Sequence, residues 1–345
     1  MQLVAYGAQD IYLTGNPQIT FFKVVYRRHT NFAVESIEQT YNGSAAASSK
    51  ISVTVSRNGD LLSSVWIANK RVAANGAVTA AEALAMIDNV EVEIGGQVID
   101  KQYGHWMQVW TDLSLGADKA TLLGACLKVG AEDGVSYIPL QFWFCRNPGL
   151  ALPLIALQYH EVKLNVTFSS TQVGTPSVWC DYVFLDTDER RRFAQVSHEY
   201  LIEQVQYSNA LAVNGTSTQH ELRFNHPVKE LVWTIDNAGT DLTCNTALLQ
   251  LNGHDRFKRR EGKYFTKVQR YQHHSGASGS DHAHVYSFAL KPEEHQPSGT
   301  CNFSRIDNAV LNLEHETAAG KLKVYAVNYN VLRIMSGMGG LAYSN

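Results

Sequence analysis

Two stretches of similar pattern, NGDLLSSVW at residues 58–66 and NHPVKELVW at residues 225–233, decide how this chain is divided. Each ends in a Val-Trp pair, and the two pairs are offset by 167 residues. One further match precedes this one and two follow it, in the same order in both halves: Phe32–Glu35 with Tyr200–Glu203, Gly96 with Gly253, and Leu164–Val166 with Leu311–Leu313. In chain order, the offsets fall from 168 to 147. Falling offsets are typical of a duplicated domain whose second copy has shorter loops.

The repeated unit is predicted to be all-β. In KISVTVSRNG, Ile51, Val53 and Val55 alternate with Ser52, Thr54 and Ser56, which indicates a half-buried strand, and Asn58-Gly59 then marks a turn. Further strands are expected at 65–67, 90–94, 162–168, 178–185, 201–207, 231–235, 285–290, 310–313 and 322–331. Short helices are expected after the Thr79–Glu82 capping box and within residues 105–115 and 118–130. Periodicity alone leaves sandwiches, barrels and jelly rolls open.

The repeat predicts an N-terminal arm at residues 1–26, a first domain at 27–193, a linker at 194–198 and a second domain at 199–345. Of the 345 residues, 45% are apolar, as in an ordinary globular protein, and the formal net charge of −3 argues against a dedicated nucleic-acid binder. The N-terminus shows no secretory pattern. The five cysteines form no Cys-x-x-Cys motif, so we expect free thiols that pack as small apolar side chains.

Several motifs suggest chemistry, but each is incomplete. HHSGASGSDHAH contains His273, His274, His282 and His284, yet Phe288 and Ala289 stand where a cupin-like metal site needs a glutamate. We therefore predict a solvated loop without metal, and no cupin-like metalloenzyme. The run DTDERRRF is expected to be a surface segment whose opposite charges neutralise each other. Because no nucleophile elbow, P-loop or His-Glu-x-x-His motif occurs, we expect neither catalysis nor a cofactor.

Sugars enter the predictions in two ways. Glycosylation sequons begin at Asn42, Asn165, Asn214 and Asn302, and we interpret them as chance occurrences because no export signal precedes them. An alternative function for the whole chain is a β-sandwich carbohydrate-binding module, since jelly rolls also serve as lectins. Its sugar platform would come from exposed tryptophans at Trp106, Trp110 or Trp143.

Four long stretches carry a resemblance that covers essentially the whole chain: QLVAYGAQDIYLTGNPQITFFKVVYRRHTNF, NPGLALPLIALQYHEVKL, QPSGTCNFSRIDNA and YNVLRIMSGMGGLAYSN. They closely resemble the major capsid proteins of large nucleocytoplasmic DNA viruses, especially those of algal viruses. The resemblance implies two consecutive eight-stranded jelly rolls with short helices in the loops. It also implies homotrimers that form pseudo-hexagonal capsomers and tile an icosahedral shell around an internal membrane. The chain is shorter than the family pattern at residues 207–221 and 236–249, the regions that correspond to loops of the family's outer face.

The resemblance also gives the N-terminal arm a role. The arm combines apolar and basic side chains, and those that we assign to assembly are Ile11, Phe21, Phe22, Tyr26, Arg27 and Arg28. Such a segment is suited to packing beneath a shell, against a minor capsid protein or the inner viral membrane, and we expect no direct contact with nucleic acid. The implied location is the virion, with assembly in the host cytoplasm.

Overall fold

The computed structural model describes residues 7–24, 29–72, 76–130, 132–237, 240–276, 282–315 and 319–343. The chain divides into two compact units, Met1–Asn31 and Phe32–Asn345. The described residues of the first unit include one short helix, α1 (Asp10–Thr14). None of the helices in the described ranges has the length and hydropathy needed to cross a membrane.

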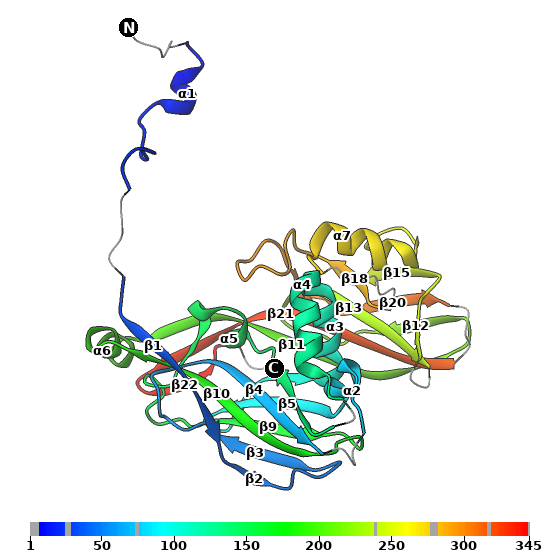
Figure 1. The fold of residues 1–345 in the computed structure, drawn as a ribbon. Coiled ribbons are helices and arrows are strands. Elements are labelled where there is room, and N and C mark those ends of the chain that lie inside the picture. The colour runs from blue at the N-terminus through cyan, green and yellow to red at the C-terminus, as the bar shows by residue number, and fades with distance from the viewer. Residues whose placement is uncertain are drawn as a thin grey trace. The chain divides into compact units, whose positions relative to one another are not determined.

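The second unit begins with a pair of antiparallel sheets that we call the first barrel (residues 32–185, blue to green in Figure 1). Sheet 1a has the order β1-β10-β4-β7, with β8 also paired to β4: β1 (Phe32–Gln39), β10 (Thr175–Leu185), β4 (Leu61–Arg71), β7 (Gly134–Pro139) and β8 (Leu152–Pro153). Sheet 1b has the order β2-β3-β9-β5-β6: β2 (Tyr41–Gly43), β3 (Lys50–Thr54), β9 (Val162–Phe168), β5 (Ile87–Ile94) and β6 (Gln97–Tyr103).

The second barrel (residues 198–341) repeats this arrangement. Sheet 2a has the order β11-β21-β13-β14: β11 (His198–Asn214), β21 (Ala319–Met335), β13 (Pro227–Asn237) and β14 (Thr240–Leu242). Three short strands also join it: β18 (His284–Ser287) and β19 (Cys301–Asn302) on β13, and β22 (Met338–Leu341) on β21. Sheet 2b has the order β12-β20-β15-β16, with β17 on β15: β12 (Ser217–Glu221), β20 (Ala309–Glu314), β15 (Thr246–Leu251), β16 (His254–Asp255) and β17 (Arg260–Glu261).

Helices fill the connections. The first barrel carries α2 (Ala80–Ala85), α3 (Gly104–Ser114), α4 (Ala117–Leu127) and α5 (Trp143–Arg146). Helix α6 (Thr187–Gln195) follows the first barrel, and a π-helical turn, η3 (Tyr264–Val268), runs directly into α7 (Gln269–His273) in the second. Both halves of the predicted capping box form: the Thr79 hydroxyl accepts from the Glu82 amide, and Glu82 accepts from the Thr79 amide. The three expected helices are therefore confirmed as α2, α3 and α4.

The duplication is most evident in sheets 1b and 2b. Ile94 pairs with Gln97 across Gly95-Gly96, and Leu251 pairs with His254 across Asn252-Gly253. These four turn residues all have positive φ, at 58°, 88°, 51° and 78° in chain order. Two consecutive left-handed residues make the hairpin turn that matches the twist of its strands. Next to each turn, Val92 pairs with Leu164 and Leu249 pairs with Leu311, so the predicted match holds residue by residue.

In sheets 1a and 2a, the predicted match holds for strands but not for residues. Strands β4 and β13 occupy the same place, each paired with the strand that also pairs with β1 or β11. However, Val65 lies in the core of the first barrel, whereas in the second barrel it is Trp233 that lies in the core. Trp66 and Val232 therefore point outward, and the pairing of Val65-Trp66 with Val232-Trp233 was wrong by one residue. A shift of one residue turns every side chain of a strand to the other face.

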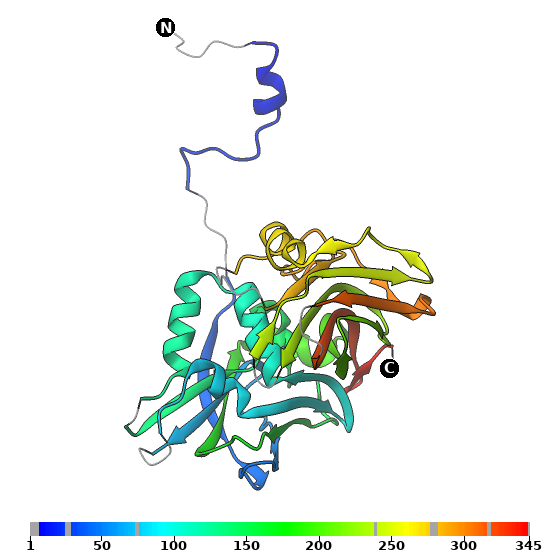
Figure 2. The same ribbon diagram turned by 90° about the vertical axis from the view of Figure 1, so that its right-hand side faces the viewer.

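Three buried clusters hold the second unit together. One fills the first barrel and extends to Ile202, Leu332 and Ile334, which belong to β11 and β21 of the second barrel. Another fills the second barrel around Trp233 and Phe265. A third consists of side chains from α3 and from sheet 2a, and Figure 2 shows α3 where the strands of the two barrels meet.

Candidate functional site

The junction between the barrels is built on α3. Its residues Trp106, Val109, Trp110 and Leu113 follow the spacing i, i+3, i+4, i+7, so they line one face of the helix. This face packs on the outer face of sheet 2a, against side chains from four strands or their flanks: Val205, Val232, Ala283, Val285, Tyr325 and Val327. Trp106 is 0% exposed, and its ring centroid lies 5.1 Å from that of Tyr325. Sequence reasoning missed this contact, although the spacing within HWMQVWTDL is a helical signal.

Hydrogen bonds from the second barrel satisfy the last carbonyl groups of α3. The Arg270 guanidinium donates to the Asp112 carbonyl at 3.0 Å, and the Gly276 amide donates to the Leu113 carbonyl at 2.8 Å. The Ser275 hydroxyl donates to the Ser114 carbonyl at 3.0 Å. The last carbonyls of a helix have no partner within it and carry partial negative charge, so an arginine there is favourable. Helix α3 is therefore shared by the two barrels.

The free edge of β11 is covered by β6. The Val205 amide donates to the Asp100 carboxylate at 3.1 Å, and the Gln204 side chain donates to the Ile99 carbonyl. Burial raises the pKa of Asp100 to about 6 although the hydrogen bonds oppose it. Pairing between β5 and β6 shifts register beside Ile99, between the pairs Val92–Asp100 and Glu93–Val98. Bulges of this kind bend a strand, and here the bend coincides with the contact to β11.

A buried group of charges lies beside this edge. Glu203 accepts from Arg146 of the first barrel at 2.8 Å and lies 2.8 Å from the ammonium of Lys229, which is fully buried. The His295 ring lies 3.7 Å from the same carboxylate. Burial alone would raise the pKa of Glu203, but His295, Lys229 and Arg146 outweigh it and lower the pKa to about 2. The carboxylate is therefore ionised at neutral pH and bridges the barrels.

Two of the four histidines differ from the predicted solvated loop, whereas His282 is exposed as predicted and residues 277–281 lie outside the described part of the chain. His274 is buried, with its Nε2 atom 3.1 Å from Glu230 and its Nδ1 atom 3.1 Å from Glu293. Burial opposes protonation, yet the two carboxylates outweigh it and raise the pKa of His274 to about 9. His284 is also buried, stacked on Trp233, and it accepts from the Cys244 amide at 3.2 Å. Solvation was thus the wrong prediction for both, because each has a specific partner that is distant in sequence.

In the described part of the chain, no group of three or more His, Cys, Asp or Glu side chains is arranged to hold a metal ion. DTDERRRF forms most of α6, where Asp186 caps the helix by accepting from the Thr187 amide at 2.7 Å. Arg190 of this helix lies 3.0 Å from Asp60. The acidic residues of this run therefore act locally, at the start of a helix.

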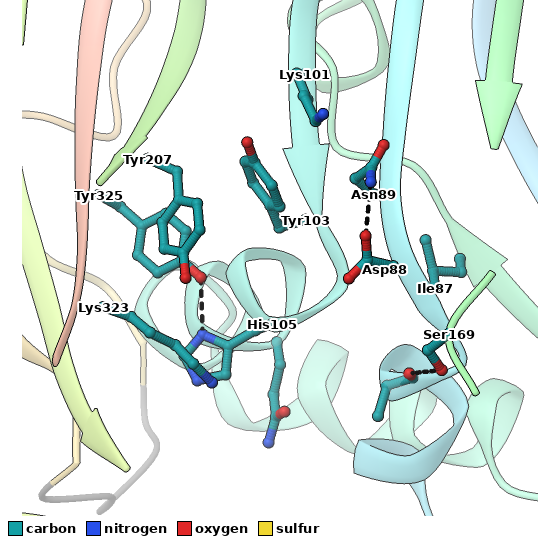
Figure 3. Close-up of a pocket in the computed structure, with 12 residues that line it drawn as sticks. Ile87, Asp88, Asn89, Lys101, Tyr103, His105, Ser169, Tyr207, Lys323 and Tyr325 are labelled. Carbon is teal, nitrogen blue, oxygen red and sulfur yellow. Dashed lines mark hydrogen bonds between the residues drawn. The ribbon is translucent and has the colours of Figure 1, made fainter. Parts of the chain in front are cut away.

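A cavity of about 510 Å³ opens where α3 begins, between β5 and β6 on one side and β11 and β21 on the other (Figure 3). Tyr103, Tyr207 and Tyr325 form one wall, with ring centroids 4.7 Å apart for the first two and 4.9 Å apart for the last two. The His105 ring lies within hydrogen-bond distance of the Tyr325 hydroxyl, at 3.1 Å. Burial, with a smaller contribution from Lys323, lowers the pKa of His105 to about 4, so its ring is neutral at neutral pH.

The outer face of sheet 1a, which corresponds to the covered face of sheet 2a, is open to solvent. Phe32, Val34 and Tyr137 on this face are exposed. Trp66 and Trp179 lie side by side in the ladder of β4 and β10, and both are half-buried. An exposed apolar surface with several aromatic side chains marks a site of interaction. The two barrels therefore differ in whether this face is covered.

The arm residues assigned to assembly are found in the first unit. Ile11, Phe21 and Phe22 are exposed, the last two by more than nine-tenths of their surface, at 92% and 97%. Tyr26, Arg27 and Arg28 lie outside the described residues. Isolated apolar side chains are common on surfaces, but several large ones within one short segment indicate a binding partner.

The sequons fall on the strands or at their ends. Asn42 in β2 and Asn214 at the end of β11 are exposed. The Asn302 side chain accepts from the Ser304 amide at 3.0 Å, which caps a short 3₁₀ turn. Asn165 is buried and donates to Glu93 at 3.1 Å.

The sugar platform is contradicted by burial. Trp106, Trp110 and Trp143 are all buried, at 0%, 5% and 2% exposure, because two of them cover sheet 2a and the third lies in the first core. No face of these rings is available to a carbohydrate. The cysteines are all unpaired, as predicted, but Cys126 is exposed rather than packed in a core.

Comparisons with known proteins agree with this architecture. Residues 20–186 match the family described as "Major capsid protein N-terminus", and residues 189–340 match "Large eukaryotic DNA virus major capsid protein". The chain is 51% identical to the major capsid protein of Pyramimonas orientalis virus, covering all of this chain and 99% of the relative. It is 44% identical to that of Paramecium bursaria Chlorella virus 1, with the same coverage. These alignments run to 395 and 435 positions against 345 residues here, so both relatives carry segments that this chain lacks.

Solved structures give the same result. A chain of the quasi-atomic model of the PBCV-1 virus capsid matches with a TM-score of 0.86 at 41% identity, covering 94% of this chain and all of that one. The Faustovirus major capsid protein matches with a TM-score of 0.76 at 11% identity, which shows the shared fold alone. The expected all-β double jelly roll is thereby confirmed. With both halves of the sequence, the whole length of two curated relatives and the arrangement of the barrels in agreement, the chain belongs to the major capsid proteins of large eukaryotic DNA viruses.

Proposed function

We propose that three copies of this chain form a homotrimeric, pseudo-hexagonal capsomer and that these capsomers tile the icosahedral shell of a large DNA virus. One observation carries the trimer: the outer face of sheet 2a is covered by the chain's own α3, whereas the equivalent face of sheet 1a, with Phe32, Val34 and Tyr137, is exposed. A second copy supplies the missing cover. Head-to-tail contacts of this kind close into a ring when the rotation permits.

Two barrels per chain explain why the ring has three members. Three chains place six similar barrels around one threefold axis, which approximates a hexagon that packs side by side in a lattice. The contact within a chain and the contact between chains then alternate around the ring. Obligate interfaces usually bury more than about 2,000 Å², and a whole sheet face with its edge strand is of suitable size.

The arm acts after the trimer has formed. It contacts minor capsid proteins or the inner viral membrane beneath the shell. The residues that make this contact are Ile11, Phe21, Phe22, Tyr26, Arg27 and Arg28, of which the last three lie outside the described residues. Exposure of the first three supports this role. The net charge of −3 gives the chain as a whole no attraction for nucleic acid, and direct binding to the genome forms no part of the proposal.

The remaining parts of the proposal follow from this structural role. The protein is neither an enzyme nor dependent on a cofactor, and it assembles in the host cytoplasm. Its working divisions are an arm at residues 1–26, jelly rolls at 27–193 and 199–345, and a linker at 194–198. The sequons at Asn42, Asn214 and Asn302 carry no obligatory glycan.

Light scattering on the purified protein tests the oligomer directly. The expected mass is about three times the 38.3 kDa of one chain, at micromolar concentration and below. Electron microscopy of the same sample should show six-lobed particles with a threefold axis. A folded monomer that persists at micromolar concentration contradicts the proposal.

A further inference from the structure

We propose that the helical segment of residues 264–273, which comprises η3 and α7, covers the outer face of sheet 1a of the next copy, as α3 covers sheet 2a within one chain. This inference rests on the proposed trimer and names the element that makes each contact between chains. It follows from the position of the segment in the repeat, from its exposed side chains and from the chemistry of the face that receives it.

The segment occupies the place of α3 in the repeated topology. Helices α3 and α4 connect β6 to β7, and β7 pairs with β4 in sheet 1a. Residues 264–273 connect the β16 and β17 region to β18, and β18 pairs with β13 in sheet 2a. Since β4 and β13 are equivalent strands, the two helical connections are equivalent as well.

Both helical connections have two apolar sides, but only one of them is fully covered. In α3, Met107 points into the first core while Trp106 and Val109 cover the second barrel. In the second barrel, Phe265 points into the core, whereas Val268 and Tyr271 are exposed, Tyr271 by 90%. Val268 and Tyr271 are three residues apart, as are Trp106 and Val109, so both pairs present a ridge along one side of a helix.

The receiving face offers a matching apolar surface. The ladder of sheet 1a places Val34 opposite Val183 and Trp66 opposite Trp179, and side chains within each pair lie on the same side of the sheet. Tyr137 of β7 extends this surface at the far edge, and it is exposed. These side chains stand where Val232, Tyr325 and Val327 receive α3 in sheet 2a.

Charge also favours this occupant. The outer face of sheet 1a carries Glu38 and Asp181, which pair with Trp179 and Ser36 on the same side of the ladder. The exposed side of the segment carries Lys267, and Lys263, which directly precedes the segment, is exposed as well. Opposite charges at the margin of an apolar contact select the correct partner and orientation more than they add affinity.

The test uses two variants that each damage one side of the contact. Tyr271→Glu places a carboxylate on the segment, and Val34→Glu places one on sheet 1a. Both positions are exposed in the single chain, so the fold of each variant should survive, as circular dichroism and thermal unfolding will show. Each variant alone should lose the trimer and run as a monomer by light scattering. Tyr159→Glu, an exposed tyrosine on neither surface, is the matched control and should remain trimeric.

Mixing the two variants gives a sharper result. The Val34→Glu chain keeps an intact helical segment and the Tyr271→Glu chain keeps an intact sheet face, so one good contact can form between them. The mixture should contain a two-chain species of about twice 38.3 kDa that neither variant forms alone. If wild type is a trimer and Tyr271→Glu remains one, the assignment of the segment is wrong while the trimer stands. If the Val34→Glu variant loses the trimer but the Tyr271→Glu variant keeps it, an element other than this segment covers the sheet. A monomeric wild type would instead refute the proposed capsomer.

Discussion

Arg146 of the first barrel and Glu203 of the second lie 2.8 Å apart in a buried ion pair, and the same carboxylate lies 2.8 Å from the fully buried ammonium of Lys229. The two barrels are thus joined by charge as well as by apolar packing. Removing one member of such a group leaves the others without compensation in a medium of low dielectric constant, which costs more than the group contributes when complete.

Glu203→Gln should therefore destabilise the protein by about 3–5 kcal/mol, because Lys229 and Arg146 lose their counter-charge. Glu199→Gln is the matched control on the same strand. Glu199 pairs with Arg333 at 2.8 Å, but both are exposed, so the expected loss is about 0–1 kcal/mol. Urea unfolding followed by tryptophan fluorescence measures both. Equal losses in the two variants would show that the buried group has no special role.

Trp106→Ala should cost about 3–5 kcal/mol, since it empties a fully buried site between the barrels. Leu122→Ala on α4 removes a large apolar side chain that is 68% exposed, and its cost should stay below about 0.5 kcal/mol. Calorimetry should also show unfolding of the Trp106 variant broadening toward two transitions as the barrels uncouple. A single sharp transition at the wild-type temperature would contradict the role of α3.

The free energy of unfolding should depend on pH through His274. The folded pKa, raised to about 9, lies above the ordinary value of 6.5, so the folded state holds this proton more tightly than the unfolded state. Its stabilisation is complete below pH about 6.5 and declines as the pH rises through about 9. His274→Gln should remove this dependence, so the difference between wild type and variant should shrink from pH 6.5 to pH 9.5. A difference that stays constant over this range would exclude the linkage.

Two glycine-to-alanine substitutions should change the free energy of unfolding in opposite directions. Gly253 has a φ of 78° in its hairpin turn, so Gly253→Ala should destabilise the second barrel by about 1–2 kcal/mol. Gly124 lies within α4, where an added methyl group would meet no neighbouring atom within 4 Å, so Gly124→Ala should stabilise the protein by about 0.5–1 kcal/mol. Thermal unfolding distinguishes the two, and a loss of stability for Gly124→Ala would mean that the helix terminus needs the glycine.

Removing residues 1–26 should leave both barrels folded and the trimer intact but should prevent assembly of the shell. The compact second unit begins only at Phe32, so its thermal stability should change little. Each apolar arm residue that becomes buried at a contact contributes roughly 1.5–3 kcal/mol, and this loss is multiplied over the lattice. Light scattering checks the trimer, and electron microscopy of virus particles made with the truncated chain checks the shell. Unfolding would place the arm in the first core, and normal shells would make it dispensable.

What the sequence could predict depended on how local the signal was. The hairpins at Gly96 and Gly253 were matched correctly because a two-residue turn needs positive φ, and Gly or Asn marks it directly. Trp66 and Trp233 do lie in equivalent strands, but their residue match is one position off, because the register shifts of β4 and β13 skip Ser63 and Lys229, which are 166 rather than 167 residues apart. A bulge inserts one residue and reverses the faces beyond it, and no residue type marks it reliably.

The site was harder to predict than the fold for a related reason. His274 and Glu230 are 44 residues apart in sequence, and Arg146 and Glu203 are 57 apart, so their partners cannot be read from spacing. A histidine among glycines and serines looks solvated until its carboxylates are known. The tryptophans of α3 carried a readable helical pattern, but their exposure depended on the second barrel. The sequence predicts the amphipathic stripe of α3, but the surface on which this stripe packs depends on the tertiary structure.

Helix α3 also sets an order of events during synthesis. It belongs to the first half of the chain, so the ribosome completes it before β13 and β21 emerge, and domains generally fold from the N-terminus as they are made. The side chains of Trp106 and Trp110 stay exposed to solvent until the second barrel folds and packs against them. A chain that stops after the first barrel would leave these side chains exposed permanently and be prone to aggregate. The second barrel is thus expected to fold after the first and against its helix α3. The two copies of the duplicated domain therefore differ in the order in which they fold.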